Sequence, residues 1–242
     1  MKPHAWITVS LALSACAGCK HPSAPMGLHP TAAGTAIVES SGGAQLGYPS
    51  AALEQPLVVQ INDKQGSSVA GAPVSFSGPA DVVFNPTQAL TDSSGQVSTQ
   101  VTLGGIAGRY ELTASSLDSA GKPLVLKIKE LAAGYQQQLG FGLDQKYCAG
   151  CHDPESTSLR VSNYDNLEVK PHAFTEGDVL NKLNDSDLLA VIGHGGPALN
   201  RSPLMPPFGA TLNKSEIQAL VAFIRLVSEP PYKLPGTVYG KQ

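Results

Sequence analysis

The hydrophobic pattern changes its period part-way along the chain, and this change constrains the fold more than any other feature. Between residues 36 and 130, apolar and polar residues alternate in short stretches rich in Val and Thr, at residues 56–63, 72–78, 95–103, 109–116 and 123–129. Alternation with a period of two is typical of half-buried β-strands. Gly, Pro, Asn and Asp occupy the turns between them. Short strands at this spacing predict a β-sandwich.

The second half of the chain has a helical pattern instead. At residues 211–227 apolar residues recur every three or four positions, and Asn213 with Glu216 has the spacing of a capping box. A shorter helix is expected near residues 186–192, with Asp185 as its N-cap and Gly193 as its end. The fold class predicted is therefore two-domain, with an all-β domain followed by an all-α domain.

Composition sets the domain count and removes one class of partner. The chain of 242 residues is long enough for two small domains, which we place at residues 36–130 and 135–229, with a tail at residues 230–242. The net charge is −3, so there is no basic surface of the kind that attracts a phosphate backbone. Nucleic acid is not an expected partner.

The N-terminal segment resembles the export signal of a bacterial lipoprotein. An apolar run at residues 5–15 is too short to span a bilayer but suits the core of a signal peptide. It ends in Leu-Ser-Ala-Cys, which is similar to a lipobox. That resemblance implies a signal peptide at residues 1–15 and a lipid anchor on Cys16, followed by a flexible tether at residues 16–35.

The residue after the lipobox bears on localisation. Ala17, rather than an aspartate, follows Cys16, and by the same resemblance this implies the outer membrane, facing the periplasm or the exterior. The alternative is an ordinary cleavage site at Ala15 to Ala17, which would leave a soluble exported protein. Both alternatives place the protein in the bacterial cell envelope or beyond.

The motif Cys-Ala-Gly-Cys-His, which ends at His152, is the most specific in the chain. A disulfide between Cys148 and Cys151 would leave His152 unexplained, and a thioredoxin-like pair needs a βαβ setting that is absent. A zinc site needs four ligands, and only His172 and His194 remain, at irregular spacing. Covalent attachment of haem c explains all three residues, because two thioethers hold the porphyrin while the adjacent imidazole reaches the iron. One haem c is predicted.

Met205 is the candidate for the sixth iron ligand. It is the only methionine in residues 135–229, and Pro203, Pro206 and Pro207 restrict the backbone of its loop. A thioether stabilises ferrous iron better than an imidazole does. The plain alternative is a methionine that fills a gap in the core.

Two further histidines need interpretation. His194 as an axial ligand would give bis-histidine iron of lower potential. A contact with a haem propionate or with solvent is favoured instead, a role that Arg201 could share through charge-assisted hydrogen bonds. His172 is expected to be an exposed loop residue.

Residues 135–229 resemble a monohaem class I cytochrome c domain. The resemblance rests on "CAGCH" and on "LMPPFGATLNKSEIQALVAFIR", which stand in the order of the family's haem motif, distal methionine loop and terminal helix. It implies that Cys148 and Cys151 carry the thioethers, that His152 is the proximal ligand and that Met205 is the distal ligand.

The same resemblance implies that Phe223 in the terminal helix packs against the helix that precedes the haem motif. In the family a glycine and an aromatic residue of that first helix make the contact. The sequence leaves the choice open among three glycines and three aromatic residues, namely Gly134, Gly140, Gly142, Tyr135, Phe141 and Tyr147.

Residues 36–130 resemble the bacterial Ig-like domain of invasin- and intimin-type adhesins. The segments "DKQG", "AGAPVSF" and "TDSSGQ" occur in the order of that family. The region has no His and no Cys, and its carboxylates are scattered. A spacer or partner-contact module is expected.

Electron transfer is the expected activity, because an iron with both axial positions filled has no open site for oxygen or peroxide. The chain is expected to be an exported, lipid-anchored electron carrier and not an enzyme. Its expected partners are redox proteins with a basic docking surface, since residues 131–229 hold seven Lys or Arg against eleven Asp or Glu. The alternatives are an adhesion or assembly protein whose haem senses redox state, and a haem peroxidase opened by loss of Met205.

Overall fold

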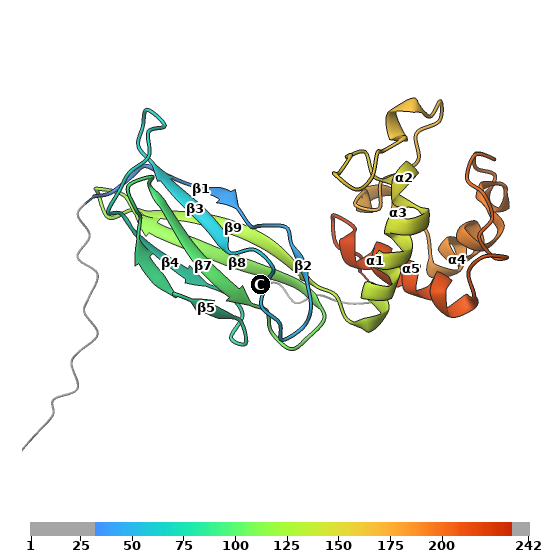
Figure 1. The fold of residues 1–242 in the computed structure, drawn as a ribbon, viewed down its shortest axis with the longest axis horizontal. Helices are drawn as coiled ribbons and strands as arrows, with labels where there is room; N and C mark the ends of the chain where they lie inside the picture. Colours follow the sequence, from blue (N-terminus) through green and yellow to red (C-terminus); the bar gives the residue numbers. More distant parts are fainter. Residues whose placement is uncertain (1–31, 234–242) are drawn as a thin grey trace, which may run out of the picture.

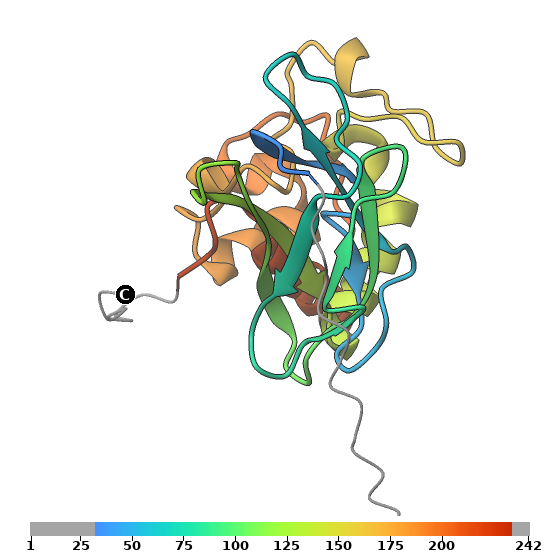
Figure 2. The same ribbon diagram turned by 90° about the vertical axis from the view of Figure 1, so that its left-hand side faces the viewer.

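The computed structural model describes residues 32–233, which form two bodies side by side (Figure 1). Strands make up the first body and helices the second, and Figure 2 looks along their common axis with the strands in front. The predicted signal peptide, Cys16 and most of the predicted tether lie outside the described residues, as does the end of the predicted tail. No helix in residues 32–233 is long and apolar enough to cross a membrane.

The first body is a β-sandwich of two sheets. One sheet has the order β1 (Ala36–Ser41), β3 (Leu57–Asn62), β7 (Gln96–Thr102) and β5 (Val83–Asn85). The other has the order β2 (Leu46–Gly47), β9 (Pro123–Ala132), β8 (Gly108–Leu117), β4 (Pro73–Ser77) and β6 (Gln88–Leu90). All pairings are antiparallel except that of β2 with β9.

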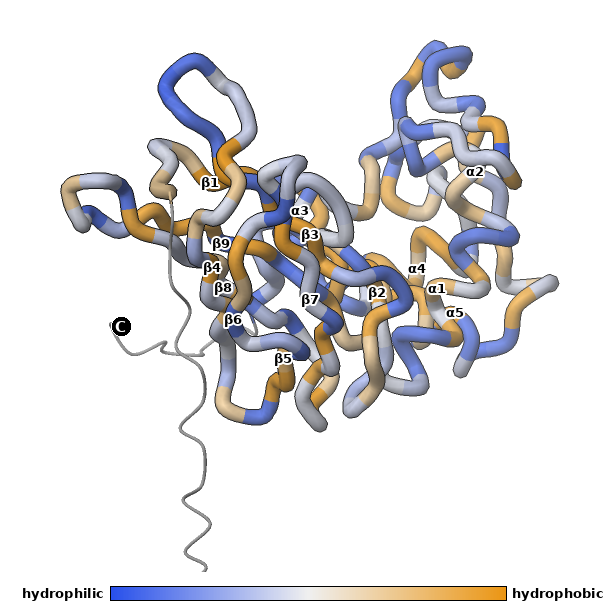
Figure 3. Tube along the Cα trace, turned by 60° about the vertical axis from the view of Figure 1, so that its left-hand side comes forward, coloured by the Kyte–Doolittle hydropathy of each residue, from blue (hydrophilic) through white to orange (hydrophobic). Residues whose placement is uncertain are grey.

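The period-two pattern places one side of each strand in the core. In β3 the side chains of Leu57, Val59 and Ile61 are fully buried, whereas the residues between them are half exposed. Leu112 of β8 and Ile128 of β9 meet them from the other sheet. Figure 3 shows apolar colours along the packed strands and hydrophilic colours in a projecting loop. The predicted sandwich is confirmed.

One charged residue interrupts this core. Glu130 takes an inward position of β9 and is fully buried, with one carboxylate oxygen accepting the backbone N–H of Gln45 at 2.7 Å. The other oxygen has no partner in the described part of the chain. Burial raises the pKa of Glu130 to about 7, because a carboxylate loses hydration in the interior.

The second body is a helical region. Its elements are α1 (Tyr135–Tyr147), α2 (Ala149–His152), η1 (Tyr164–Asn166), α3 (Gly177–Leu180), α4 (Asp185–His194), η2 (Gly196–Leu199) and α5 (Lys214–Val227). Its apolar core consists of Leu180, Leu188, Ile192, Leu212, Ile217, Leu220, Val221 and Ile224. This set, which we call the helical core, lies mainly between α4 and α5.

Local sequence signals set the ends of α5 and α4. The capping box at α5 is present, since Asn213 Oδ1 accepts the N–H of Glu216 and Glu216 Oε2 accepts that of Asn213. The expected N-cap of α4 was wrong by one residue. Asn184 caps the helix by accepting the N–H of Asp187 at 2.8 Å, and α4 ends before Gly195, whose φ of +83° suits a glycine.

The crossing of α1 and α5 holds the helical region together. A Cβ on Gly140 would lie 2.1 Å from the carbonyl oxygen of Ala219, so the two backbones touch at this point. Beside it, the rings of Phe141 and Phe223 pack with centroids 5.5 Å apart. Of the glycines and aromatic residues left open by the sequence, Gly140 and Phe141 are therefore the pair that meets α5.

Candidate functional site

A single helical turn presents the Cys-x-x-Cys-His residues. Cys148 ends α1 by donating its N–H to the carbonyl of Asp144 at 2.8 Å, and its own carbonyl accepts the N–H groups of Cys151 and His152. Both thiols are free, so no disulfide joins them. Cys148 is partly buried against the helical core, and burial raises the pKa of its thiol to about 12, while Cys151 is exposed. Two unpaired sulfurs are thus available on one turn.

The ring of His152 is fixed in one orientation and one tautomer. Its Nδ1 lies 2.7 Å from the backbone carbonyl of His172, and a carbonyl oxygen only accepts, so Nδ1 carries the proton. The other nitrogen, Nε2, therefore keeps its lone pair. Phe174 packs on the ring with centroids 4.8 Å apart, and burial lowers the pKa of His152, which favours the neutral ring. These are the properties of an axial ligand oriented by a second hydrogen bond.

His172 has a role that the sequence analysis missed. Its side chain is exposed, as expected, and its Nδ1 lies 2.8 Å from Oε2 of Glu176. The group that serves the site is its backbone carbonyl. A carbonyl contact leaves no signature in residue type, so no signal in the sequence could have identified it.

Met205 lies in the loop between η2 and α5. It is half buried and packs against the helical core, as do Cys148 and Phe174, so the structure brings the methionine and the haem motif to one apolar cluster. Its backbone carbonyl accepts the N–H of Gly196 at 3.1 Å. A Cβ on Gly195 would come within 2.9 Å of the same carbonyl, so the end of α4 supports the loop closely.

The other predicted candidates lie further out. His194, the last residue of α4, is exposed, and so is Arg201. Arg160, which the sequence analysis did not single out, is more deeply placed. It donates to the carbonyl of Ala149 at 2.9 Å and pairs with Asp153, but its buried Nε has no partner in the described residues.

The donor set fits a covalently attached haem. Free thiols on Cys148 and Cys151, a neutral imidazole with its Nε2 lone pair available and a thioether at the same apolar cluster are the groups that haem c uses. The unpartnered Nε of Arg160 offers an additional donor next to the motif. Among the described residues no cluster of three or more His, Cys, Asp or Glu could hold a bare metal ion.

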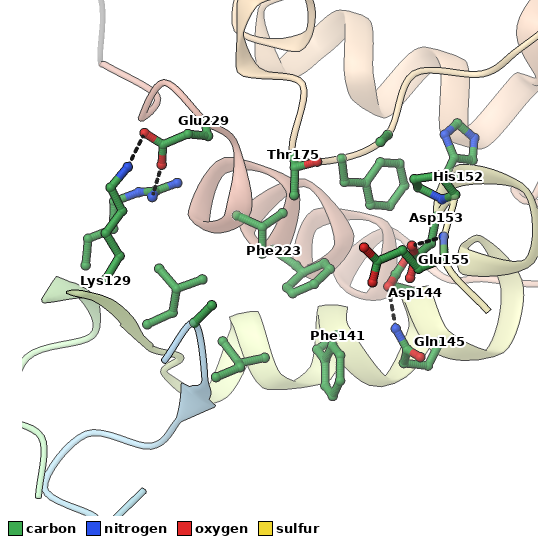
Figure 4. Close-up of a pocket in the computed structure, with 18 residues that line it drawn as sticks. Lys129, Phe141, Asp144, Gln145, His152, Asp153, Glu155, Thr175, Phe223 and Glu229 are labelled. Atoms are coloured by element: carbon green, nitrogen blue, oxygen red, sulfur yellow. Dashed lines mark hydrogen bonds and ion pairs between the residues drawn. The ribbon is translucent and has the colours of Figure 1, made fainter. Parts of the chain in front are cut away.

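A cavity of about 590 Å³ lies between the two bodies (Figure 4). His152 and Asp144 lie toward one end of it, Lys129 and Glu229 toward the other, and Phe141 and Phe223 between them. Asp144 is only 6% exposed, and burial raises its pKa to about 6. The cavity thus extends from His152 in the helical region to Arg109 and Lys129 in the sandwich.

Comparison with known families gives the helical region its identity. Residues 136–224 match the model of the family described as cytochrome C oxidase, cbb3-type, subunit III. This region is a cytochrome c domain. No curated protein matches the chain.

Solved structures of the adhesin type resemble the N-terminal part of the chain. They include the D00-D0 domain of intimin, at 16% identity over 44% of this chain and 51% of that one, with a TM-score of 0.32. Invasin, described as a bacterial integrin-binding protein, aligns at 16% identity over 43% of this chain and 21% of that one, with a TM-score of 0.31. A glycosyl hydrolase family 2 member from Bacteroides cellulosilyticus aligns at 19% identity over 40% and 14%, also at 0.31. The match thus spans about half of the intimin structure.

Proposed function

We propose that the protein is an exported electron carrier with one covalently attached haem c. Cys148 and Cys151 would carry the thioethers, and His152 and Met205 would bind the iron. The observation that carries the proposal is the bond from His152 Nδ1 to the His172 carbonyl, which leaves Nε2 as a ligand beside two free thiols. When bound, haem c supplies reversible one-electron exchange between ferric and ferrous iron.

The residues of the chain have separate tasks in this scheme. The His172 carbonyl orients the imidazole and increases its basicity, and Phe174 restricts its rotation. The helical core packs against Met205 and Cys148 and would keep water away from a haem bound there. Ligation by both His152 and Met205 leaves no open position, which favours electron transfer over catalysis.

The division of labour follows the two bodies. Residues 135–229 would be the electron-transfer unit, with an acidic excess suited to a redox partner that docks through a basic surface. Residues 36–130 would be a spacer or contact module. A redox-sensing adhesin and a haem peroxidase are the competing functions, and no observation on the structure favours either.

Covalent attachment is the first expected outcome. Protein matured with haem should keep a peroxidase-active haem stain at its own mass on a denaturing gel, because thioether bonds survive denaturation. Changing both Cys148 and Cys151 to alanine should abolish the stain completely. A stain of wild-type strength in the double variant would contradict the assignment. A redox titration followed by optical spectroscopy should show one reversible one-electron transition.

Lipid anchoring is the second expected outcome. We place Cys16 at the membrane as the acylated first residue of an outer-membrane lipoprotein, because the segment before it resembles a lipobox. Each buried methylene of an acyl chain contributes about 0.8 kcal/mol to membrane binding, so two or more chains anchor firmly. Cys16→Ser should move the protein out of the membrane fraction or stop its processing. An unchanged distribution between fractions would refute the anchor.

A further inference from the structure

We infer that the β-sandwich positions the proximal ligand of the cytochrome domain, through a contact centred on Glu229. Arg109 and Lys129 of the sandwich hold Glu229, and Glu229 holds the loop whose carbonyl orients His152. This inference rests on the proposed function, because it takes His152 as an iron ligand. It assigns the sandwich a part in the site rather than the role of a spacer alone.

The first step is the ion pair between the bodies. Glu229 follows α5, and its two carboxylate oxygens are held separately, by Arg109 Nη1 of β8 at 2.8 Å and by Lys129 Nζ of β9 at 3.0 Å. Arg109 also donates through its second terminal nitrogen to the carbonyl of Ser228. The hydrogen bond from Lys129, with the charge of Arg109, lowers the pKa of Glu229, so the carboxylate is anionic at neutral pH.

The second step joins Glu229 to the loop at residues 172–177, which we call the proximal loop. The N–H of Glu229 donates to the carbonyl of Thr175 at 2.8 Å, and the N–H of Gly177 donates to the carbonyl of Glu229 at 3.0 Å. Glu176 and Glu229 form a parallel β bridge. A Cβ on Gly177 would lie 2.4 Å from the carbonyl oxygen of Pro230, so the two segments are in close contact.

The third step runs within the proximal loop to the ligand. Glu176 accepts the N–H of Ala173 at 3.0 Å through one oxygen, and its other oxygen lies 2.8 Å from Nδ1 of His172. These bonds set the peptide between His172 and Ala173, whose carbonyl accepts Nδ1–H of His152 at 2.7 Å. Phe174 of the same loop packs on the His152 ring. The path from Arg109 to the imidazole is therefore continuous.

We expect the contact between Arg109 and Glu229 to affect the electron-donor strength of His152 more than the free energy of unfolding. The side chains of Arg109 and Glu229 are 27% and 46% exposed, and ion pairs at such positions contribute little to the free energy of unfolding. A hydrogen bond at Nδ1 makes the imidazole a better electron donor, which favours ferric iron. If the proximal loop shifts away from His152, the donor strength falls and the midpoint potential rises.

The test uses the full haem-loaded chain and three variants. Arg109→Ala removes two of the contacts to the segment after α5, and Arg109→Lys keeps the charge. Lys127→Ala is the control, because Lys127 lies on β9, the strand that pairs with β8, and forms an ion pair at 2.8 Å with Glu111, which is not part of the path. The measurements are the midpoint potential and the hydrogen exchange rates of the Gly177 and Glu229 amides.

Arg109→Ala should raise the midpoint potential and speed exchange at both amides several-fold. Arg109→Lys should change the midpoint potential and the exchange rates less than Arg109→Ala does. Lys127→Ala should leave both quantities unchanged. Faster exchange at an unaltered potential would overturn the inference, as would no change in either quantity. A wild-type chain without covalent haem would instead refute the proposed function. The exchange arm can still be measured on that chain, and there unchanged rates in Arg109→Ala would overturn the inference.

Discussion

Gly140→Ala should unfold the cytochrome domain at a much lower denaturant concentration than the wild-type chain requires. The added methyl group would sit 2.1 Å from the Ala219 carbonyl oxygen and 2.7 Å from Cβ of Phe223. Backbone atoms cannot turn aside as a flexible side chain can, so α1 and α5 must separate and the Phe141–Phe223 contact weakens with them. We expect a loss of about 3 kcal/mol or more in the free energy of unfolding. Helical circular dichroism during urea unfolding measures it.

Gly142→Ala is the matched control on the same helix. A Cβ on Gly142 meets no atom within 4 Å, so the substitution introduces no clash. Alanine is favoured over glycine in a helix by about 1 kcal/mol, and this variant should therefore be slightly more stable than wild type. Equal unfolding midpoints for the two variants would show that the close crossing of α1 and α5 is not what limits position 140.

The features predictable from the sequence are those with a local signature. The period-two stretches correspond to strands β3, β4, β7, β8 and β9, because alternate burial in a sandwich imposes that period. Asn213 and Glu216 identify the start of α5 for the same reason, since both halves of a capping box lie within four residues. Strands of two or three residues, such as β2 and β6, are too short to show a period.

The features that could not be predicted depend on contacts between distant segments. Gly140 and Gly142 look alike in sequence, and only the close approach of Ala219 and Phe223 in α5 distinguishes them. Glu130 continues the alternation of β9 as a charged residue at an inward position, and its pairing with Gln45 comes from a segment 85 residues away. The contact of Arg109 with Glu229 spans 120 residues and carries no motif.

The candidate site also has one part that is predictable from local sequence and another that depends on contacts between distant segments. Cys148, Cys151 and His152 occur together in the sequence, so the chemistry is visible from their spacing alone. The acceptor of the His152 proton is a carbonyl 20 residues away, and the loop that fixes it depends on Glu176 and Glu229. Sequence motifs therefore predict the candidate ligands, whereas the groups that orient them become visible only in the fold.

Replacing Met205 should change the coordination and the midpoint potential of the iron more than any other single substitution in the loop between η2 and α5. With Met205 as a ligand, the ferric protein should show a weak near-infrared sulfur-to-iron band. Met205→His should keep six-coordinate iron but lower its potential, because imidazole favours ferric iron more than a thioether does. Met205→Ala should open a coordination position, with faster binding of carbon monoxide or cyanide and new peroxidase activity. Stopped-flow binding and optical redox titration measure these effects.

In the native protein the methionine must leave the iron before carbon monoxide or cyanide can bind. The fraction of protein with the methionine released therefore sets how much faster Met205→Ala binds these ligands. If the open form is a minor state of about 0.1–10%, Met205→Ala should speed ligand binding about 10- to 1,000-fold. Leu204→Ala is the matched control, because Leu204 is adjacent in the same loop but 60% exposed, and it should leave the band and the rates unchanged. A native spectrum without the sulfur band, combined with loss of the low-spin signature in His194→Ala, would transfer the ligand role to His194. Since His194 is exposed at the end of α4, that transfer would require the helix end and the Met205 loop to rearrange together.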